Sequence, residues 1–176
     1  MTSFTDDMQR RGMRPSSRTL ELRTSPAGAR LGRLLRVSPS EPVVIATRLR
    51  LADGESMAIE TVHIRASRVP GLGARDLEER SFYVLLEERY GIEIVGGEQT
   101  IEPTVTDEDE SDALGVPLHS PAFRFERLTQ SAEGEIVEFV ESVYRGDRYK
   151  LVTALNRPRE RQRARAARAA KSDGHR

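Results

Sequence analysis

Three charged residues stand where a β-hairpin would place its core-facing side chains. Arg48 and Arg50 are two positions apart in "TRLRLADGESMAIE" (47–60), and Glu60 interrupts the apolar run after "DGES". Residues i and i+2 of a strand point to the same face about 6.6 Å apart, so the two guanidinium groups are expected to be neighbours. Such a pair can hold a phosphate or carboxylate bidentately. A solvated outer face is the other interpretation, and these residues alone leave both open.

The face that Glu60 occupies depends on the hairpin register. An even loop count, as "DGES" alone would give, places Glu60 opposite Leu49 and away from the arginines. A bulge that makes the count odd places it opposite Arg48 or Arg50. There it could neutralise an arginine or accept hydrogen bonds from a polyol bound beside the anion.

Two predicted helix starts could add donors for the same anion. "SFTDDMQRRG" (3–12) and "SFYVLLEERYG" (81–91) each begin with a capping residue and end at a glycine. The backbone N–H groups after Phe4 and after Ser81 would be unpaired at positive dipole ends, and the hydroxyls of Ser81 and Tyr83 could assist. Taken singly, each start is equally typical of an ordinary cap.

A third polar stretch, "EIVEFVESVYRGDRY" (135–149), predicts a strand with Glu138 and Tyr144 on one face. In a regular strand these two would be about 20 Å apart, so a small ligand could touch both only where the strand bends. Glu60 and Glu138 could form a carboxylate pair. No histidine, cysteine or glycine-flanked serine forms a nucleophile arrangement, and no phosphate loop or dinucleotide fingerprint is present.

The surrounding sequence predicts the elements that position these residues. Two hairpins are expected, one around "DGES" and one around "SAEGE", and a further strand is expected to bend at Gly96 and Gly97. The expected strands are 19–23, 43–52, 57–64, 92–106, 122–130 and 135–145, and the expected helices are 3–12, one that starts at Ser25 and Pro26, 81–91 and 106–115.

A weak repeat relates the two hairpins. "SEPVVIATRLRLADGE" is echoed by "HSPAFRFERLTQSAEGE" at an offset of about 80 residues. The pattern indicates two similar helix-plus-hairpin halves that share one antiparallel sheet, with helices to one side, which makes an α+β domain. The matched pairs are Pro42 with Pro121, Arg48 with Arg127 and Gly54 with Gly134.

Composition narrows the class of protein. The 176 residues are 37% hydrophobic and 32% charged, which is typical of one soluble domain with a tail. The absence of cysteine excludes disulfides and thiolate metal sites, and three scattered histidines argue against a histidine metal site. No apolar run approaches the ~18 residues of a membrane span, and no signal-peptide pattern follows Met1. We therefore expect a cytoplasmic protein with no cofactor and no membrane partner.

The zero net charge conceals an uneven distribution. From Arg157 onward eight basic residues face two acidic ones, so the tail carries +6 and the rest of the chain −6. We predict a domain over 1–156 and a basic, disordered tail over 157–176. An acidic body is a poor surface for nucleic acid, so direct contact with DNA or RNA would come from the tail or from another domain.

Four separated motifs together resemble a known family. "SFTDDMQRRGMRPSSR", "TRLRLADGESMAIET", "SFYVLLEERYG" and "VESVYRGDRYKLV" look like the effector-binding (UTRA) domain of HutC-type GntR transcription regulators, over residues 3 to 155 and in consistent order. "SFTDDM" and "SVYRGDRY" are most similar to the N-acetylglucosamine-utilisation repressors of NagR or DasR type.

The resemblance implies a chorismate-lyase-like fold, an antiparallel sheet with flanking helices, usually in a homodimer. It also implies a small-molecule effector, glucosamine-6-phosphate or N-acetylglucosamine-6-phosphate. Carried over by motif, the phosphate-binding positions are Arg48, Arg50, Ser81, Tyr83, Phe4 and Thr5, the last two on a loop that closes over the ligand. The sugar-facing positions are Glu60, Glu138 and Tyr144. Since buried charges are costly unless paired or liganded, we predict the odd loop count, with Glu60 on the arginine face.

The resemblance also implies a winged helix-turn-helix domain that binds DNA, and this chain contains none. We expect a truncated piece of a longer regulator rather than a stand-alone effector domain, acting as a ligand sensor and not as an enzyme. Two alternatives are a lyase or isomerase on the same fold that acts on an anionic cyclic substrate, and a nucleic-acid adaptor that works through residues 157–176.

Overall fold

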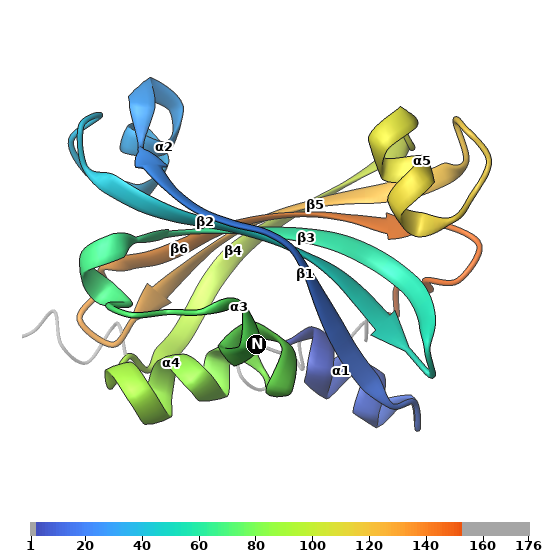
Figure 1. Cartoon of the computed structure of the whole chain (residues 1–176), viewed down its shortest axis with the longest axis horizontal. Coiled ribbons are helices and arrows are strands. Elements are labelled where there is room, and N and C mark those ends of the chain that lie inside the picture. Colours follow the sequence, from blue (N-terminus) through green and yellow to red (C-terminus); the bar gives the residue numbers. More distant parts are fainter. Residues whose placement is uncertain (1–2, 153–176) are drawn as a thin grey trace, which may run out of the picture.

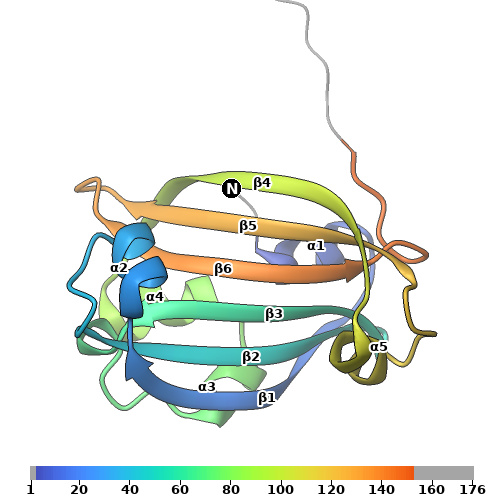
Figure 2. The ribbon, with the colours of Figure 1, turned by 90° about the horizontal axis from the view of Figure 1, so that it is seen from above.

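The apolar strand segments assemble into one six-stranded antiparallel sheet in the computed structural model, which describes residues 3–152. The sheet order is β1-β2-β3-β6-β5-β4 (Figure 2). The strands are β1 (Pro15–Pro26), β2 (Pro42–Ala52), β3 (Glu55–Arg65), β4 (Ile94–Val105), β5 (Pro121–Ser131) and β6 (Ile136–Arg145). The α+β prediction is confirmed. The predicted basic tail over 157–176 lies outside the described residues.

The internal repeat is confirmed as two structural halves. The first half runs β1, α2 (Gly28–Leu35), β2 and β3, and the second runs β4, α5 (Glu108–Leu114), β5 and β6. The halves meet where β3 pairs with β6 in the middle of the sheet. Arg48 of β2 and Arg127 of β5 hold equivalent positions, each the seventh residue of its strand.

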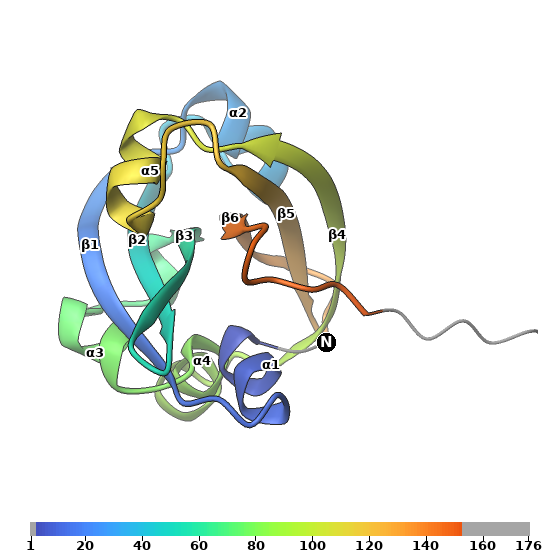
Figure 3. The same cartoon turned by 90° about the vertical axis from the view of Figure 1, so that its right-hand side faces the viewer.

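Helices lie on both faces of the curled sheet, not on one side as predicted (Figures 1 and 3). The concave face is covered by α1 (Phe4–Arg10), α3 (Ala74–Glu79) and α4 (Phe82–Tyr90). Helices α2 and α5 lie on the convex face because each bridges an outer strand to the next one inward. The helices at 3–12, 81–91 and 106–115 are confirmed. Helix α3 and a 3-10 turn, Ala66–Arg68, were not predicted, since such short elements leave little periodicity.

The interior forms two layers against the sheet. Leu85 and Leu86 of α4 pack with Val62 and Val140 on the concave face. On the convex face, Leu35 of α2 packs in a separate cluster with the inner strands. None of the helices in the described part of the chain is long and apolar enough to cross a membrane.

The first strand is longer than predicted and includes Ser25 and Pro26, which were predicted to start a helix. Instead of ending at Arg23, β1 continues to Pro26, which pairs with Pro42, and α2 begins only at Gly28. Ser25 therefore caps no helix. Because β1 lies at the sheet edge, the missing N–H of Pro26 removes no necessary ladder bond.

The register of the first hairpin has the predicted odd count. Its turn is Asp53–Gly54, both with positive φ (52° and 81°), as a tight type I′ turn requires. Ser56 pairs with Leu51, but Ala58 pairs with Arg50, so Met57 is an extra, bulged residue. The bulge places Glu60 directly opposite Arg48.

The bend predicted at Gly96 and Gly97 is also confirmed. The register of β4 against β5 shifts between Ile94 and Gly96. A Cβ at Gly97 would lie 2.4 Å from the carbonyl oxygen of Leu128, so only glycine allows β5 this close.

Helix α1 depends on a capping box at Ser3. The Ser3 hydroxyl accepts from the Asp6 N–H at 3.1 Å, and the Asp6 carboxylate accepts from the Ser3 N–H at 3.0 Å. We expect Ser3→Ala to lower the free energy of unfolding by about 1 kcal/mol in urea titrations. Ser25→Ala is the matched control, with an expected change below about 0.5 kcal/mol. Equal effects of the two substitutions would show that the cap does not stabilise α1.

Candidate ligand-binding pocket

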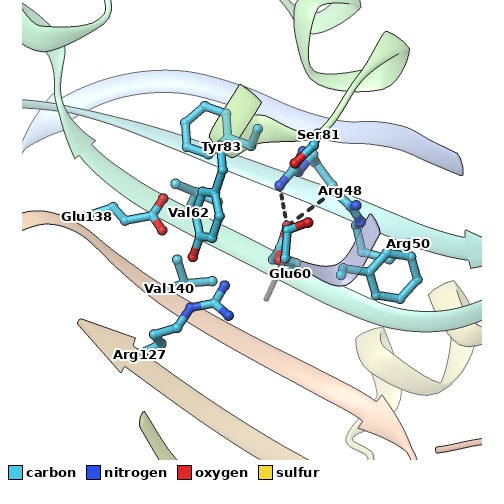
Figure 4. A pocket seen from close by; sticks show the side chains of 12 residues that line it. Arg48, Arg50, Glu60, Val62, Ser81, Tyr83, Arg127, Glu138 and Val140 are labelled. Carbon is cyan, nitrogen blue, oxygen red and sulfur yellow. Dashed lines mark hydrogen bonds and ion pairs between the residues drawn. The ribbon is translucent and has the colours of Figure 1, made fainter. Parts of the chain in front are cut away.

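One polar pocket lies between the concave face of the sheet and helices α1 and α4 (Figure 4). It combines side chains from both halves of the repeat. Its lining residues are Ser3, Phe4, Arg48, Arg50, Glu60, Val62, Ser81, Phe82, Tyr83, Arg127, Glu138 and Val140. Seven of the nine predicted site residues are therefore brought together, while Thr5 and Tyr144 line adjoining hollows.

Arg48, Arg50 and Glu60 form a buried ion-pair cluster. Their exposed fractions are only 2%, 3% and 4%. Arg48 Nη2 donates to Glu60 Oε1, and Arg50 Nη1 lies 3.5 Å from the same oxygen. Arg48 Nη1 also donates to the Leu77 carbonyl at 3.3 Å. The two arginines thus share one carboxylate, which leaves donors available for a second anion.

The charges of this cluster depend on one another. Burial by itself would raise the pKa of Glu60, but Arg48 and Arg50, assisted by Arg127, lower it to about 2. Burial lowers the pKa of Arg50 to about 10, against the attraction of Glu60. Glu60 and Arg50 are therefore charged at neutral pH, and two guanidinium groups beside one carboxylate give the cluster a net positive charge.

Helices α1 and α4 bring further polar groups to these arginines. The Thr5 hydroxyl accepts from Arg50 Nη2 at 3.3 Å, and the Arg50 guanidinium lies 4.6 Å from the centre of the Phe4 ring. Ser81 is the N-cap of α4, and its hydroxyl makes no capping hydrogen bond. The start of α4 therefore keeps donors directed at the pocket.

The other end of the pocket contains Glu138, Tyr83 and Arg127. The Tyr83 hydroxyl is close enough to Glu138 to influence its pKa, but neither of them, nor Arg127 Nε, has a partner in good hydrogen-bonding geometry among residues 3–152. Burial raises the pKa of Glu138 to about 7, although Arg127 opposes this. Burial, followed by the nearby Glu138, also raises the pKa of Tyr83. Groups of this kind, shielded from solvent and unpaired, are typical of a binding site.

Tyr144 lies away from this end, in an aromatic hollow. Strand β6 is regular between Glu138 and Tyr144, so the bend that would bring them to one small ligand does not occur. The Tyr144 ring packs against Phe125 and Tyr149, with centroids 4.7 and 4.5 Å away. Arg127 lines both the polar pocket and this hollow.

The polar pocket is closed. Its side chains approach so nearly that the space among them holds about one water molecule. A sugar phosphate does not fit unless the surrounding side chains or helices move apart. Ser3 and Phe4, at the start of α1, line the pocket, so this end of the helix forms one of its walls.

Five lining residues were not predicted to belong to the site: Ser3, Val62, Phe82, Arg127 and Val140. The repeat already matched Arg127 with Arg48, and this equivalence could have identified it. Ser3 was predicted only as a helix cap. Among residues 3–152, no group of three or more metal-ligating side chains could hold a metal ion.

Comparison with known proteins decides the family. The profile of the UTRA domain matches residues 10–150. The chain belongs to the UTRA domain family. This UTRA domain is 33% identical to the transcriptional repressor NagR of Bacillus subtilis over 157 residues, which cover 89% of the chain and 64% of NagR. The chain thus spans less than two thirds of that relative.

Solved structures show the same fold. The effector domain of PhnF from Mycobacterium smegmatis superposes with a TM-score of 0.80 at 24% identity, over 88% of this UTRA domain and 95% of that chain. A GntR-family regulator from Enterococcus faecalis gives 0.72 at 24% identity, over 80% and 100%. The flanked antiparallel sheet is therefore shared with other regulator domains.

Proposed function

We propose that this UTRA domain is the effector sensor of a transcriptional repressor and that its effector is a phosphorylated amino sugar, glucosamine-6-phosphate or N-acetylglucosamine-6-phosphate. The observation that carries the proposal is the pair of buried arginines, which share a single carboxylate at the start of α4. The likeness to NagR favours an amino-sugar ligand for this pocket.

A phosphate fits the arginine end because several kinds of donor converge there. Arg48, Arg50 and Ser81 line the same pocket, and Ser81 is the N-cap of α4, where the first N–H groups of the helix lie. Such charge-assisted hydrogen bonds are about twice as strong as neutral ones, and a helix N-terminus favours an anion. Glu60 now takes the place of that anion beside Arg48, and a dianion could displace it.

A sugar fits the rest of the pocket because its hydroxyl and amino groups are donors and acceptors. Glu60 and Glu138 are acceptors when ionised, while Arg127 is a donor. Tyr144 belongs to the sugar-binding part of this proposal only if the ligand extends past Arg127 into the aromatic hollow.

Ligand entry would act on α1, and this gives the sensor its output. Opening the pocket changes the contacts of Phe4 and Thr5 with Arg50. The ligand can shift the position of α1 only by its difference in affinity between the closed and open states. The proposal also includes a DNA-binding domain that precedes α1 in the intact regulator. The intact regulator is proposed to be a homodimer.

Isothermal titration calorimetry tests the phosphate site. Arg50→Ala is expected to weaken binding of either amino-sugar phosphate by about 1.5–3 kcal/mol, the contribution of hydrogen bonds to a charged group. Arg23→Ala on β1, an exposed arginine paired with Glu21, is the matched control and is expected to bind as the wild type does.

Two results would contradict the proposal. One is equal affinity for phosphorylated and unphosphorylated amino sugars. The other is steady conversion of the sugar phosphate to a product, followed by NMR, which would instead support a lyase or isomerase.

A further inference from the structure

The chain makes a tight turn directly after β6. The Gly146 N–H donates to the Pro121 carbonyl at 2.9 Å, and a Cβ at Gly146 would lie only 2.7 Å from that oxygen, so glycine is required here. The Arg145 side chain holds the Asp147 carboxylate at 2.7 and 3.0 Å. The Tyr149 N–H closes the turn by donating to the Arg145 carbonyl at 2.9 Å. These contacts fix the path of the chain up to Tyr149.

Beyond the turn the chain is joined to helix α1 by four residues, which we call the latch: Asp7, Arg11, Tyr149 and Lys150. The Tyr149 hydroxyl donates to Asp7 Oδ2 at 3.2 Å, and Arg11 Nη2 donates to the Lys150 carbonyl at 3.0 Å. The Arg11 guanidinium lies 4.7 Å from the centre of the Tyr149 ring and holds both Asp7 oxygens at 3.0 Å. The latch therefore ties α1 to the segment that follows the last strand.

Helix α1 has few other attachments. It is seven residues long, and so short a helix is not stable by itself. Its buried residues are Phe4 and Met8. Met8 packs in a small cluster with Met57, and the Phe4 ring contacts Arg50 in the polar pocket. The position of α1 therefore depends on these contacts and on the latch.

The latch has one fixed side and one side that can separate. The Tyr149 ring is fixed to the sheet, because its centroid lies 4.5 Å from that of Tyr144 and 5.7 Å from that of Phe125. The ion pair on α1 is partly hydrated, since the Asp7 and Arg11 side chains are 31% and 29% exposed. Ion pairs of this kind contribute little to stability. The polar contacts can therefore break while the apolar core stays intact.

The latch also borders a space through which a ligand could reach the polar pocket. All four latch residues line the aromatic hollow, whose volume of about 540 Å³ is within the range of ligand pockets. Phe4 and Arg127 line both the hollow and the polar pocket. The start of α1 thus lies between the hollow and the pocket, and none of the four latch residues lines the pocket itself.

We propose that the latch holds α1 over the closed pocket and that its opening controls the rate at which the effector enters. Arg11 and Tyr149 are then positioning residues, which act on the ligand through α1. This inference rests on the proposed function, because it requires an effector that binds in the polar pocket.

Hydrogen exchange of the ligand-free whole chain tests the latch without any effector. Arg11→Met removes the contacts with Asp7, Tyr149 and Lys150, so we expect the amides of α1 to exchange about fivefold faster, while those of β3 and β6 keep their rates. Tyr149→Phe loses only the hydroxyl and is expected to give a smaller increase, about twofold. Arg10→Met, at the exposed position next to Arg11, is the matched control and should exchange as the wild type does.

Stopped-flow kinetics tests the control of entry. The probes are glucosamine-6-phosphate and N-acetylglucosamine-6-phosphate, followed by tyrosine fluorescence because the chain contains no tryptophan. The association rate should rise by the same factor as the exchange of α1, about fivefold in Arg11→Met, since entry is proportional to the open fraction. A residue that only stabilised the fold would not raise this rate.

The outcomes separate this inference from the proposed function. Unchanged exchange of α1 in both latch variants would overturn the inference, as would equal acceleration in α1, β3 and β6, since the residues would then support the whole fold. Faster exchange of α1 with an unchanged association rate would also overturn it, and would leave the proposed function intact. If neither phosphate binds to the wild type, the proposed function is wrong and the control of entry is wrong with it. The milder Tyr149→Phe keeps the test decisive if Arg11→Met does not fold.

Discussion

Replacement of Arg48 by Met is expected to lower the free energy of unfolding by about 3–5 kcal/mol, the usual cost of leaving a buried charge without its partner. Glu60 is 4% exposed and would keep only Arg50, 3.5 Å away. Urea titration followed by circular dichroism measures the loss. The double variant Arg48→Met/Glu60→Gln should recover much of it, because the charge that lost its partner is then absent.

An exposed ion pair on the same sheet provides the control. Arg124 lies 3.6 Å from Glu110, and its side chain is 46% exposed. Arg124→Met should change the free energy of unfolding by less than about 1 kcal/mol, as for other surface pairs. If Arg48→Met were as mild, Glu60 would be hydrated in solution and the closed pocket would be wrong.

The second large effect concerns Glu138 and pH. The folded protein raises the pKa of this carboxyl to about 7 from an ordinary value of 4.5. The folded protein favours the protonated form of Glu138. Its contribution to stability is therefore complete below pH 4.5 and is lost as the pH rises to about 7 and the carboxyl ionises. With ~1.4 kcal/mol per pKa unit, the loss is about 3 kcal/mol. Urea titrations of wild type and Glu138→Gln between pH 4.5 and 8 measure it as their difference.

The Gln variant isolates this effect from the other buried groups. The lowered pKa of Glu60 affects stability only below pH 4.5. His63 acts in the opposite direction within the same range, because burial lowers its pKa, and it is present in both proteins. Glu138→Gln should therefore become the more stable protein as the pH passes 7. Parallel pH profiles would show that Glu138 is not buried as an unpaired acid.

Local chemistry in the sequence accounts for much of the site. The two-residue period of a strand places Arg48 and Arg50 on one face, and Asp53–Gly54 has the residues of a tight hairpin turn. Serine caps and glycine stops predicted α1 and α4 with small errors at their ends. Each of these features is decided by residues within about ten positions of one another.

Where the sequence misled, a longer-range contact overrode a local pattern. Ser25–Pro26 is typical of a helix start, yet pairing of Pro26 with Pro42 extends β1 through it. Helices α2 and α5 were expected on the same side as the others, but the sheet order gives them the convex face.

The sequence by itself determined a hairpin with Arg48 and Arg50 on one face and the starts of α1 and α4, because turn chemistry, strand period and capping act between near neighbours. Only the tertiary structure decided that side chains from both halves of the repeat line one pocket. The pairing of β3 with β6 brings Arg127 and Glu138 to Arg48 and Glu60, from distant parts of the chain. It also decided that one Arg–Glu couple is joined and the other held apart, since cross-strand register depends on bulges and on strand order, which no local pattern specifies.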